Sequence, residues 1–104
     1  MTGFNDREKA FEGKFALDQE LKFRAEARRN KLLGQWAAGL MGKADVDAYA
    51  KEVVASDFEE AGDEDVFRKI RGDFDAAGVT QSDADIRSKM LELLAIAVDQ
   101  IQNT

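Results

Sequence analysis

The hydrophobic and polar positions of this chain alternate with the period of an α-helix along most of its length. The clearest stretch runs from Arg28 to Gly42, where Leu33, Trp36 and Leu40 are three and four residues apart and share one side of a helix. Small residues between them would let a neighbouring backbone approach closely, namely Gly34, Ala37, Ala38 and Gly39. We therefore predict that this stretch is the central helix of a small helical core.

Four segments share this period, and short polar connections separate them. We expect helices over residues 6–41, 46–61, 64–77 and 83–102. Side chains suited to capping precede the last three, namely Asp45, Asp63 and Ser82. Glycine readily adopts the left-handed conformation that ends a helix, and the first three segments end at Gly42, Gly62 and Gly78. Short connections favour antiparallel neighbours, so the predicted fold is all-α, a four-helix bundle.

The first predicted helix is too long for its companions. On a rise of 1.5 Å per residue it would span roughly 54 Å, whereas the fourth would span about 30 Å. We therefore divide the chain into an N-terminal arm, residues 1–18, that is helical or flexible, and a bundle domain, residues 19–104. The arm has three aromatic side chains on one helical face, Phe4, Phe11 and Phe15. Either the chain bends near Gly13 or Asp18 and folds the arm back, or these rings bind another protein.

The composition argues against several classes of function. The chain has 104 residues, a formal charge of −6, and neither His nor Cys. It therefore lacks the commonest general base, the commonest metal ligand and any thiolate nucleophile, so we expect a binding or regulatory module and no enzyme. The acidic body disfavours nucleic acid as a partner. No apolar run approaches the length of a membrane span, so we expect a cytoplasmic protein without direct membrane insertion.

An acidic cluster between residues 57 and 65 was tested against the calcium-binding EF-hand pattern. A loop beginning at Asp57 would have Gly62 at the required sixth position, but Arg68 would stand at the twelfth, where a bidentate Glu is needed. A loop beginning at Asp73 would have Ala84 at that position. Both fail, and we predict no metal site.

A basic collar precedes the apolar part of the first helix. Four of its members are candidates for contact with a partner or with nucleotide phosphates: Arg24, Arg28, Arg29 and Lys31. The plainer interpretation is a solvated helix face, with Glu20 paired to Arg24 and Glu26 paired to Arg29. The chain has no Gly-rich phosphate-binding loop. Any nucleotide binding would therefore be weak and non-hydrolytic, and no cofactor is expected.

The chain closely resembles the zeta subunit of the alpha-proteobacterial F-type ATP synthase, a family formerly described only as a domain of unknown function. The resemblance covers nearly the whole sequence, and it is most specific in the segments ARRNKLLGQWAAGL and DFEEAGDEDV. It implies an inhibitor of the rotary motor whose bundle lies outside the catalytic head. It also implies that the N-terminal arm enters a catalytic interface between an alpha and a beta subunit, near the gamma subunit, and blocks rotation in the ATP-hydrolysis direction.

Carried onto this sequence, the resemblance assigns the inhibitory segment to Thr2 through about Gln19. Its implied anchors are Phe4, Phe11 and Phe15, and its implied polar contacts are Arg7, Glu8, Glu12 and Lys14. The resemblance also implies weak ADP or ATP binding and a position at the inner membrane when the protein is bound to the ATP synthase. We expect a monomer when free. The alternative functions are a generic helical adaptor that binds through the collar and a weak adenine-nucleotide-responsive module.

Overall fold

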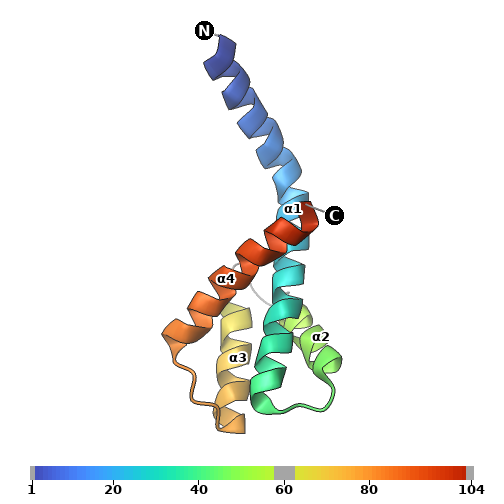
Figure 1. The fold of residues 1–104 in the computed structure, drawn as a ribbon, viewed down its shortest axis with the longest axis vertical. Helices are drawn as coiled ribbons and strands as arrows, with labels where there is room; N and C mark the ends of the chain where they lie inside the picture. The colour runs from blue at the N-terminus through green and yellow to red at the C-terminus, as the bar shows by residue number, and fades with distance from the viewer. Residues whose placement is uncertain (1, 58–62, 103–104) are drawn as a thin grey trace.

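Every regular element in the described part of the chain is a helix. The structure is a computed structural model that describes residues 2–57 and 63–102, with side chains described from Gln19 onward. In chain order the helices are α1 (Thr2–Met41), α2 (Val46–Ser56), α3 (Glu64–Ala77) and α4 (Asp83–Gln102). Figure 1 shows that consecutive helices run antiparallel, with α4 crossing α1 obliquely. The predicted all-α, four-helix fold is confirmed.

α1 is the helix against which the other three pack. It contacts α2, α3 and α4, whereas α2 and α4 make no contact with each other within the described ranges. The core between the helices consists of the buried side chains Leu33, Ala37, Ala38, Tyr49, Val53, Val66, Phe67, Ile70, Phe74, Ile86 and Met90. Trp36 packs at its edge, where its ring lies 5.5 Å from that of Phe74 in an edge-to-face arrangement.

Leu40 does not join this core, although the sequence pattern places it there. Its side chain is 43% exposed. The reason is its position in the last turn of α1, because α4 crosses α1 farther toward the N-terminus and leaves this turn uncovered (Figure 1).

Gly34 is a point of close approach between α1 and α2. A Cβ atom at this position would lie 2.6 Å from the Cα atom of Ala50 and 3.2 Å from Cγ2 of Val53. The expectation of a close backbone contact is therefore confirmed here. It was wrong for Gly39, where a Cβ atom would meet nothing within 4 Å.

Local sequence signals account for most of the helix ends. Asp45 accepts a hydrogen bond from the backbone N–H of Ala48 at 3.0 Å, and Ser82 accepts one from the N–H of Asp85 at 3.0 Å. Gly42 and Gly78 have φ of 69° and 74°, in the left-handed region.

Two predicted ends differ from the structure. α1 begins at Thr2, ahead of the expected start at residue 6, and α2 ends at Ser56, before the expected end at residue 61. The predicted stop signal for α2, Gly62, lies outside the described residues. Asp63 occupies the N-cap position of α3 as expected, but its side chain makes no capping hydrogen bond. Its carboxylate binds an arginine of α1 instead, as described below.

The lengths of the helices confirm the predicted mismatch. α1 has 40 residues and α4 has 20. The last turns of α4, at Ile101 and Gln102, lie beside Gln19 and Leu21 of α1. Within the residues whose side chains are described, the bundle packs against α1 from Gln19 onward. The division into an arm and a bundle domain at residue 18 stays a prediction, because the arm side chains lie outside the described residues.

Replacing Gly34 with Ala should destabilise the protein by about 1–3 kcal/mol, because the added methyl group meets the α2 backbone and the helices must move apart. Gly39→Ala is the matched control, since the same helix has open space there. It should be neutral or stabilising by up to about 1 kcal/mol through helix propensity. Urea denaturation of the two variants measures both effects, and equal stabilities would contradict the proposed contact.

Candidate functional site

Three regions of the chain are candidates for binding: the arm, the basic collar and the surface between α1 and α4. The side chains of the predicted arm contacts lie outside the described residues, so their role stays a prediction; they are Phe4, Arg7, Glu8, Phe11, Glu12, Lys14 and Phe15. The collar and the α1–α4 surface are described, and they begin where α1 enters the bundle.

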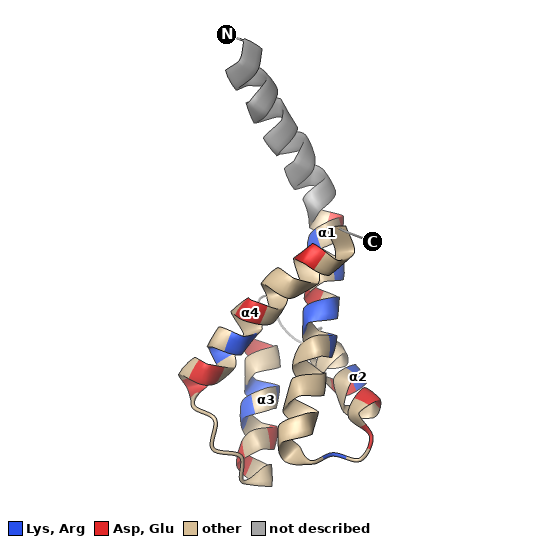
Figure 2. Cartoon of the chain, in the orientation of Figure 1, with Lys and Arg blue, Asp and Glu red and all other residues tan. Residues whose placement is uncertain are grey.

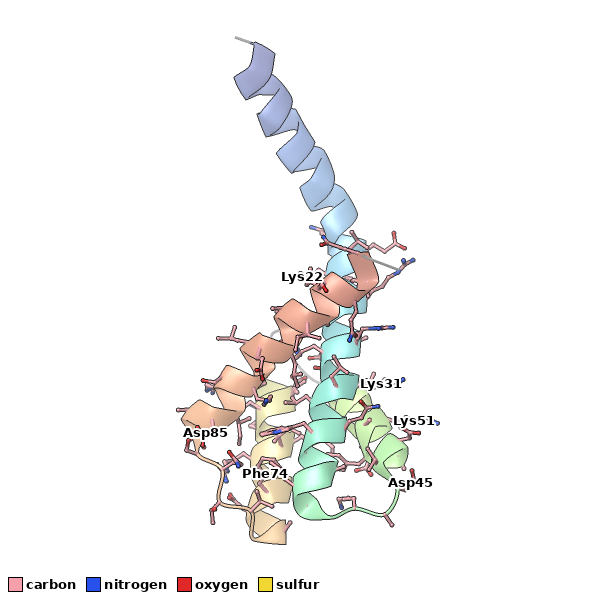
Figure 3. The ribbon with its side chains drawn as sticks, in the orientation of Figure 1. Lys22, Lys31, Asp45, Lys51, Phe74 and Asp85 are labelled. Atoms are coloured by element: carbon pink, nitrogen blue, oxygen red, sulfur yellow. The ribbon has the colours of Figure 1, made fainter. Side chains whose placement is uncertain are left out.

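The exposed part of the collar lies along one segment of α1. Figure 2 shows charged residues on α1 only above its apolar C-terminal section. Arg24 forms the predicted ion pair with Glu20, with Nη2 3.3 Å from Oε1. Arg28 is exposed and donates from Nη1 to Oε1 of Gln100 at 2.9 Å, which ties α1 to α4. Lys31 is exposed and projects outward from α1 (Figure 3).

Arg29 is the exception, because it is buried with only 1% of its surface exposed. Its Nε donates to Oδ1 of Asn30 at 2.8 Å, and its Nη2 donates to Oδ1 of Asp63 at 2.9 Å. The expected pairing with Glu26 is therefore wrong: Glu26 lies 3.9 Å from Lys22 instead. Arg29 stands one helical turn from Leu33, on the side of α1 that faces the interior. The structure thus uses this guanidinium inside the protein, and its predicted phosphate contact remains without support.

Asn30 continues the same network to the end of α2. Its Nδ2 donates to Oδ2 of Asp57 at 3.0 Å. Arg29 and Asn30 together therefore hold Asp57, which caps the C-terminus of α2, and Asp63, which precedes α3. We call these four residues the α1 clamp. It anchors both ends of the connection between α2 and α3 to consecutive residues of one helix.

The two carboxylates of the α1 clamp have opposite electrostatic environments. The hydrogen bond from Arg29 holds the pKa of Asp63 below its ordinary value. Burial raises the pKa of Asp57, and the hydrogen bond from Asn30 only partly offsets this. At neutral pH the ionised Asp63 therefore contributes to stability, whereas the ionised Asp57 opposes it.

Neither a metal-binding cluster nor a membrane-spanning helix is found in the described residues. Within residues 19–57 and 63–102 no group of acidic side chains is arranged to hold a metal ion. Asp57 and Asp63, at the two ends of the α2–α3 connection, belong to the α1 clamp, and Asp65 is buried in the first turn of α3. No helix in the described residues is both long and apolar enough to cross a bilayer.

Sequence reasoning missed a surface aromatic residue and an apolar groove. Phe23 of α1 is 75% exposed, immediately after the predicted arm. The groove has a volume of about 370 Å³ and lies between α1 and the C-terminal half of α4. Its apolar lining consists of Leu21, Ala25, Leu94, Val98 and Ile101, and its polar lining of Gln19, Lys22, Glu26 and Gln102.

A signal for the groove was present in the sequence. Leu91, Leu94, Val98 and Ile101 repeat at three and four residues along α4. The neighbouring core stripe of Ile86, Met90, Leu93 and Ala97 has the same spacing. One helix with two adjacent apolar stripes can bury one against the core and leave the other for a second contact.

The chain is similar to known proteins over most of its length. A family model described as ATPase inhibitor subunit zeta matches residues 1–100 of the chain. No curated protein sequence matches it. A protein structure solved in solution by NMR is 48% identical in sequence, with a TM-score of 0.71, and the match covers 80% of this chain and 96% of that chain.

The opposite environments in the α1 clamp lead to a paired prediction at pH 7. Asp63→Asn should destabilise the protein by about 1–2 kcal/mol, because the buried guanidinium of Arg29 loses a charged acceptor. Asp57→Asn should be neutral or stabilising, because a half-buried charge is removed while an oxygen acceptor for Asn30 remains. Denaturant unfolding measures both changes.

The pH dependence supplies the control for this pair. Asp63 has a lowered folded-state pKa, so its contribution is present above the unfolded pKa and is lost as the pH falls through the folded pKa. Asp57 has a raised folded-state pKa, so its unfavourable contribution disappears as the pH falls through that value. Both substitutions should therefore have smaller effects at about pH 3 than at pH 7. Effects of the same sign and size at both pH values would contradict the assignment.

Proposed function

Since this chain belongs to the ATPase inhibitor subunit zeta family, we propose that it inhibits an F-type ATP synthase by inserting its N-terminal arm at an interface between a catalytic beta subunit and an alpha subunit. The arm would block rotation of the gamma subunit in the ATP-hydrolysis direction. The observation that carries this proposal is the length of α1, which has 40 residues although the described packing of the bundle begins near Gln19.

The connection between the arm and the bundle supports a mechanical role. α1 is one continuous helix through Gly13 and Asp18 into the core, where Leu33 and Ala37 are fully buried. A continuous helix transmits a load along its axis, because its backbone hydrogen bonds connect successive turns. Force on the arm would therefore be resisted by the bundle, which lies outside the interface that the arm enters.

The aromatic side chains of the arm would supply the affinity. Phe4, Phe11 and Phe15 share one helical face, and each would contribute about 1.5–3 kcal/mol if fully buried on binding. Arg7, Glu8, Glu12 and Lys14 would form the polar contacts around them. An arm that fits only one conformation of the catalytic interface would stabilise that conformation over the others. Such selective binding stops a cyclic motor, since every cycle must leave the stabilised state.

The described surface of α1 next to the arm would extend the contact. Phe23 is 75% exposed, and Arg24 follows it with 65% of its side chain exposed. Both lie on the part of α1 that would stand at the mouth of the interface. Arg28 and Lys31 continue the basic surface toward the core. This segment therefore has both an aromatic residue and positive charge available for the subunit that receives the arm.

Deletion of residues 1–18 should abolish inhibition of ATP hydrolysis and leave the bundle folded, because the buried apolar side chains of the described residues begin at Ala25. ATPase assays of the purified enzyme with increasing amounts of each protein measure the inhibition. Circular dichroism and thermal unfolding confirm that the truncated chain is folded. Inhibition by the folded truncated protein would show that the arm is not the inhibitory element.

Phe23→Ala tests the contact beyond the arm. The stability should change by less than about 0.5 kcal/mol, because the ring is exposed in the free protein. Loss of a buried aromatic contact of about 1–2 kcal/mol would raise the concentration needed for half-inhibition by about 5- to 30-fold. Leu40→Ala is the matched control, since Leu40 is an exposed apolar residue at the far end of the same helix. Equal inhibition by the two variants would exclude Phe23 from the interface.

A further inference from the structure

The groove between α1 and α4 is an apolar surface that the four-helix fold does not fill. Val98 is 37% exposed and Leu91, one apolar repeat earlier on α4, is 72% exposed. Leu94 and Ile101 are half-buried. The α1 wall contributes Leu21 and Ala25, and Lys22 at its rim is labelled in Figure 3. This is the type of surface that receives an amphipathic helix.

We propose that this groove is the resting site of the chain's own arm, so that the free protein exchanges between the extended α1 of the structure and a form in which residues 4–15 fold back along α4. The inference of a regulatory role rests on the proposed function of the arm. The existence of the folded-back form does not, and it is tested separately.

The spacing of apolar residues supports this occupant. Leu91, Val98 and Ile101 follow one another at intervals of seven and three residues on α4, and Phe4, Phe11 and Phe15 follow at seven and four. Two helices with the same rise can bring such residues together in order. Phe4 would lie beside Leu91, Phe11 beside Val98, and Phe15 beside Ile101. The arm would then run parallel to α4 and antiparallel to the rest of α1.

The position of the groove supports it as well. Gln19 and Leu21 are the first residues of α1 that line the groove, so the arm is connected directly to its upper end. Reversal of the chain within residues 16–19 would require a connection of about four residues, which is typical of an αα-hairpin. Because the arm is tethered, its effective concentration at the groove is in the range of about millimolar for a short connection. An untethered partner would have to compete with this segment.

The two uses of the arm would exclude each other. The same face of Phe4, Phe11 and Phe15 would be buried in the groove of the free protein and in the interface of the inhibited enzyme. Inhibitory strength would then depend on the fraction of molecules with an open arm. Weakening the groove should make the protein a stronger inhibitor, whereas weakening the arm itself should make it a poorer one.

Paramagnetic broadening in NMR spectra of the full-length protein tests the folded-back form. The chain contains no Cys, so Asn5→Cys provides one position for a spin label. Along an extended α1 this position would be about 36 Å from the level of Leu91, too far for strong broadening. In the folded-back form the methyl signals of Leu91 and Leu94 should be broadened strongly.

Val98→Asp in the labelled protein should abolish this broadening, because it places a charge in the apolar groove. Ile96→Asp is the matched control, since Ile96 is similarly exposed at 41% and lies on α4 outside the groove. It should leave the broadening unchanged. Absence of broadening without either substitution, or its persistence in Val98→Asp, overturns the proposal. Broadening that appears only between labelled and unlabelled molecules in a mixture assigns the groove to a second copy and also overturns it.

Inhibition assays then test the regulatory consequence. If the arm is folded back in about nine of ten molecules, Val98→Asp should lower the concentration for half-inhibition by up to about tenfold. A rise in that concentration would show that the groove binds the enzyme, contrary to the proposal. A protein that shows the broadening but never inhibits would retain the folded-back form and contradict only the proposed function.

Discussion

The contact between Gly34 of α1 and Ala50 of α2 determines how closely the two helices lie, and the rest of the core depends on that distance. With no side chain at Gly34, the backbones approach until Ala50 and Val53 touch the glycine directly. Leu33 and Ala37, on either side, are fully buried as a result of this approach and of the packing of α3. α1 is thereby held firmly in the bundle over its C-terminal half, and a helix held in this way can carry its other half as a functional segment.

The same helix also organises the polar interior. Arg29 and Asn30 are consecutive residues, yet they connect α1 to the end of α2 and to the start of α3. Other ion pairs hold the remaining helices at the surface: Arg87 contacts Glu64 with both terminal nitrogens and stacks over Phe67 at 4.0 Å, which links α4 to α3. Within the described residues, no buried side-chain nitrogen or oxygen lacks a hydrogen-bond partner. The buried polar side chains of the described bundle are therefore all hydrogen-bonded. Exposed apolar side chains such as Phe23 and Leu91 are the groups that a binding partner could bury.

The sequence predicted much of this fold because its signals are local. The helical period placed Leu33 and Trp36 on the face of the first helix that packs into the core, and the caps at Asp45 and Ser82 follow from side chains that bond to nearby backbone groups. The helical phase places Arg29 one turn before the buried Leu33, but the sequence does not show that Asp63, 34 residues away, supplies the partner that lets this arginine be buried. The prediction for Leu40 was wrong, and Phe23 was missed, because a helical pattern identifies a face but not how far a crossing helix covers it. The groove could not be predicted from the sequence, because it depends on where α4 crosses α1.

Arg29 and Asn30 hold both ends of the α2–α3 connection on α1. The placement of α2 and α3 is therefore fixed by α1 as well as by the residues that connect them. Asp57 and Asp63 are positioned by α1, so the distance between them does not depend on the residues that join them. A change in the number of residues between them would leave both attachment points on α1 in place. The same property makes residues 58–62 a suitable place to insert a fluorescent or affinity tag without disturbing either the arm or the groove.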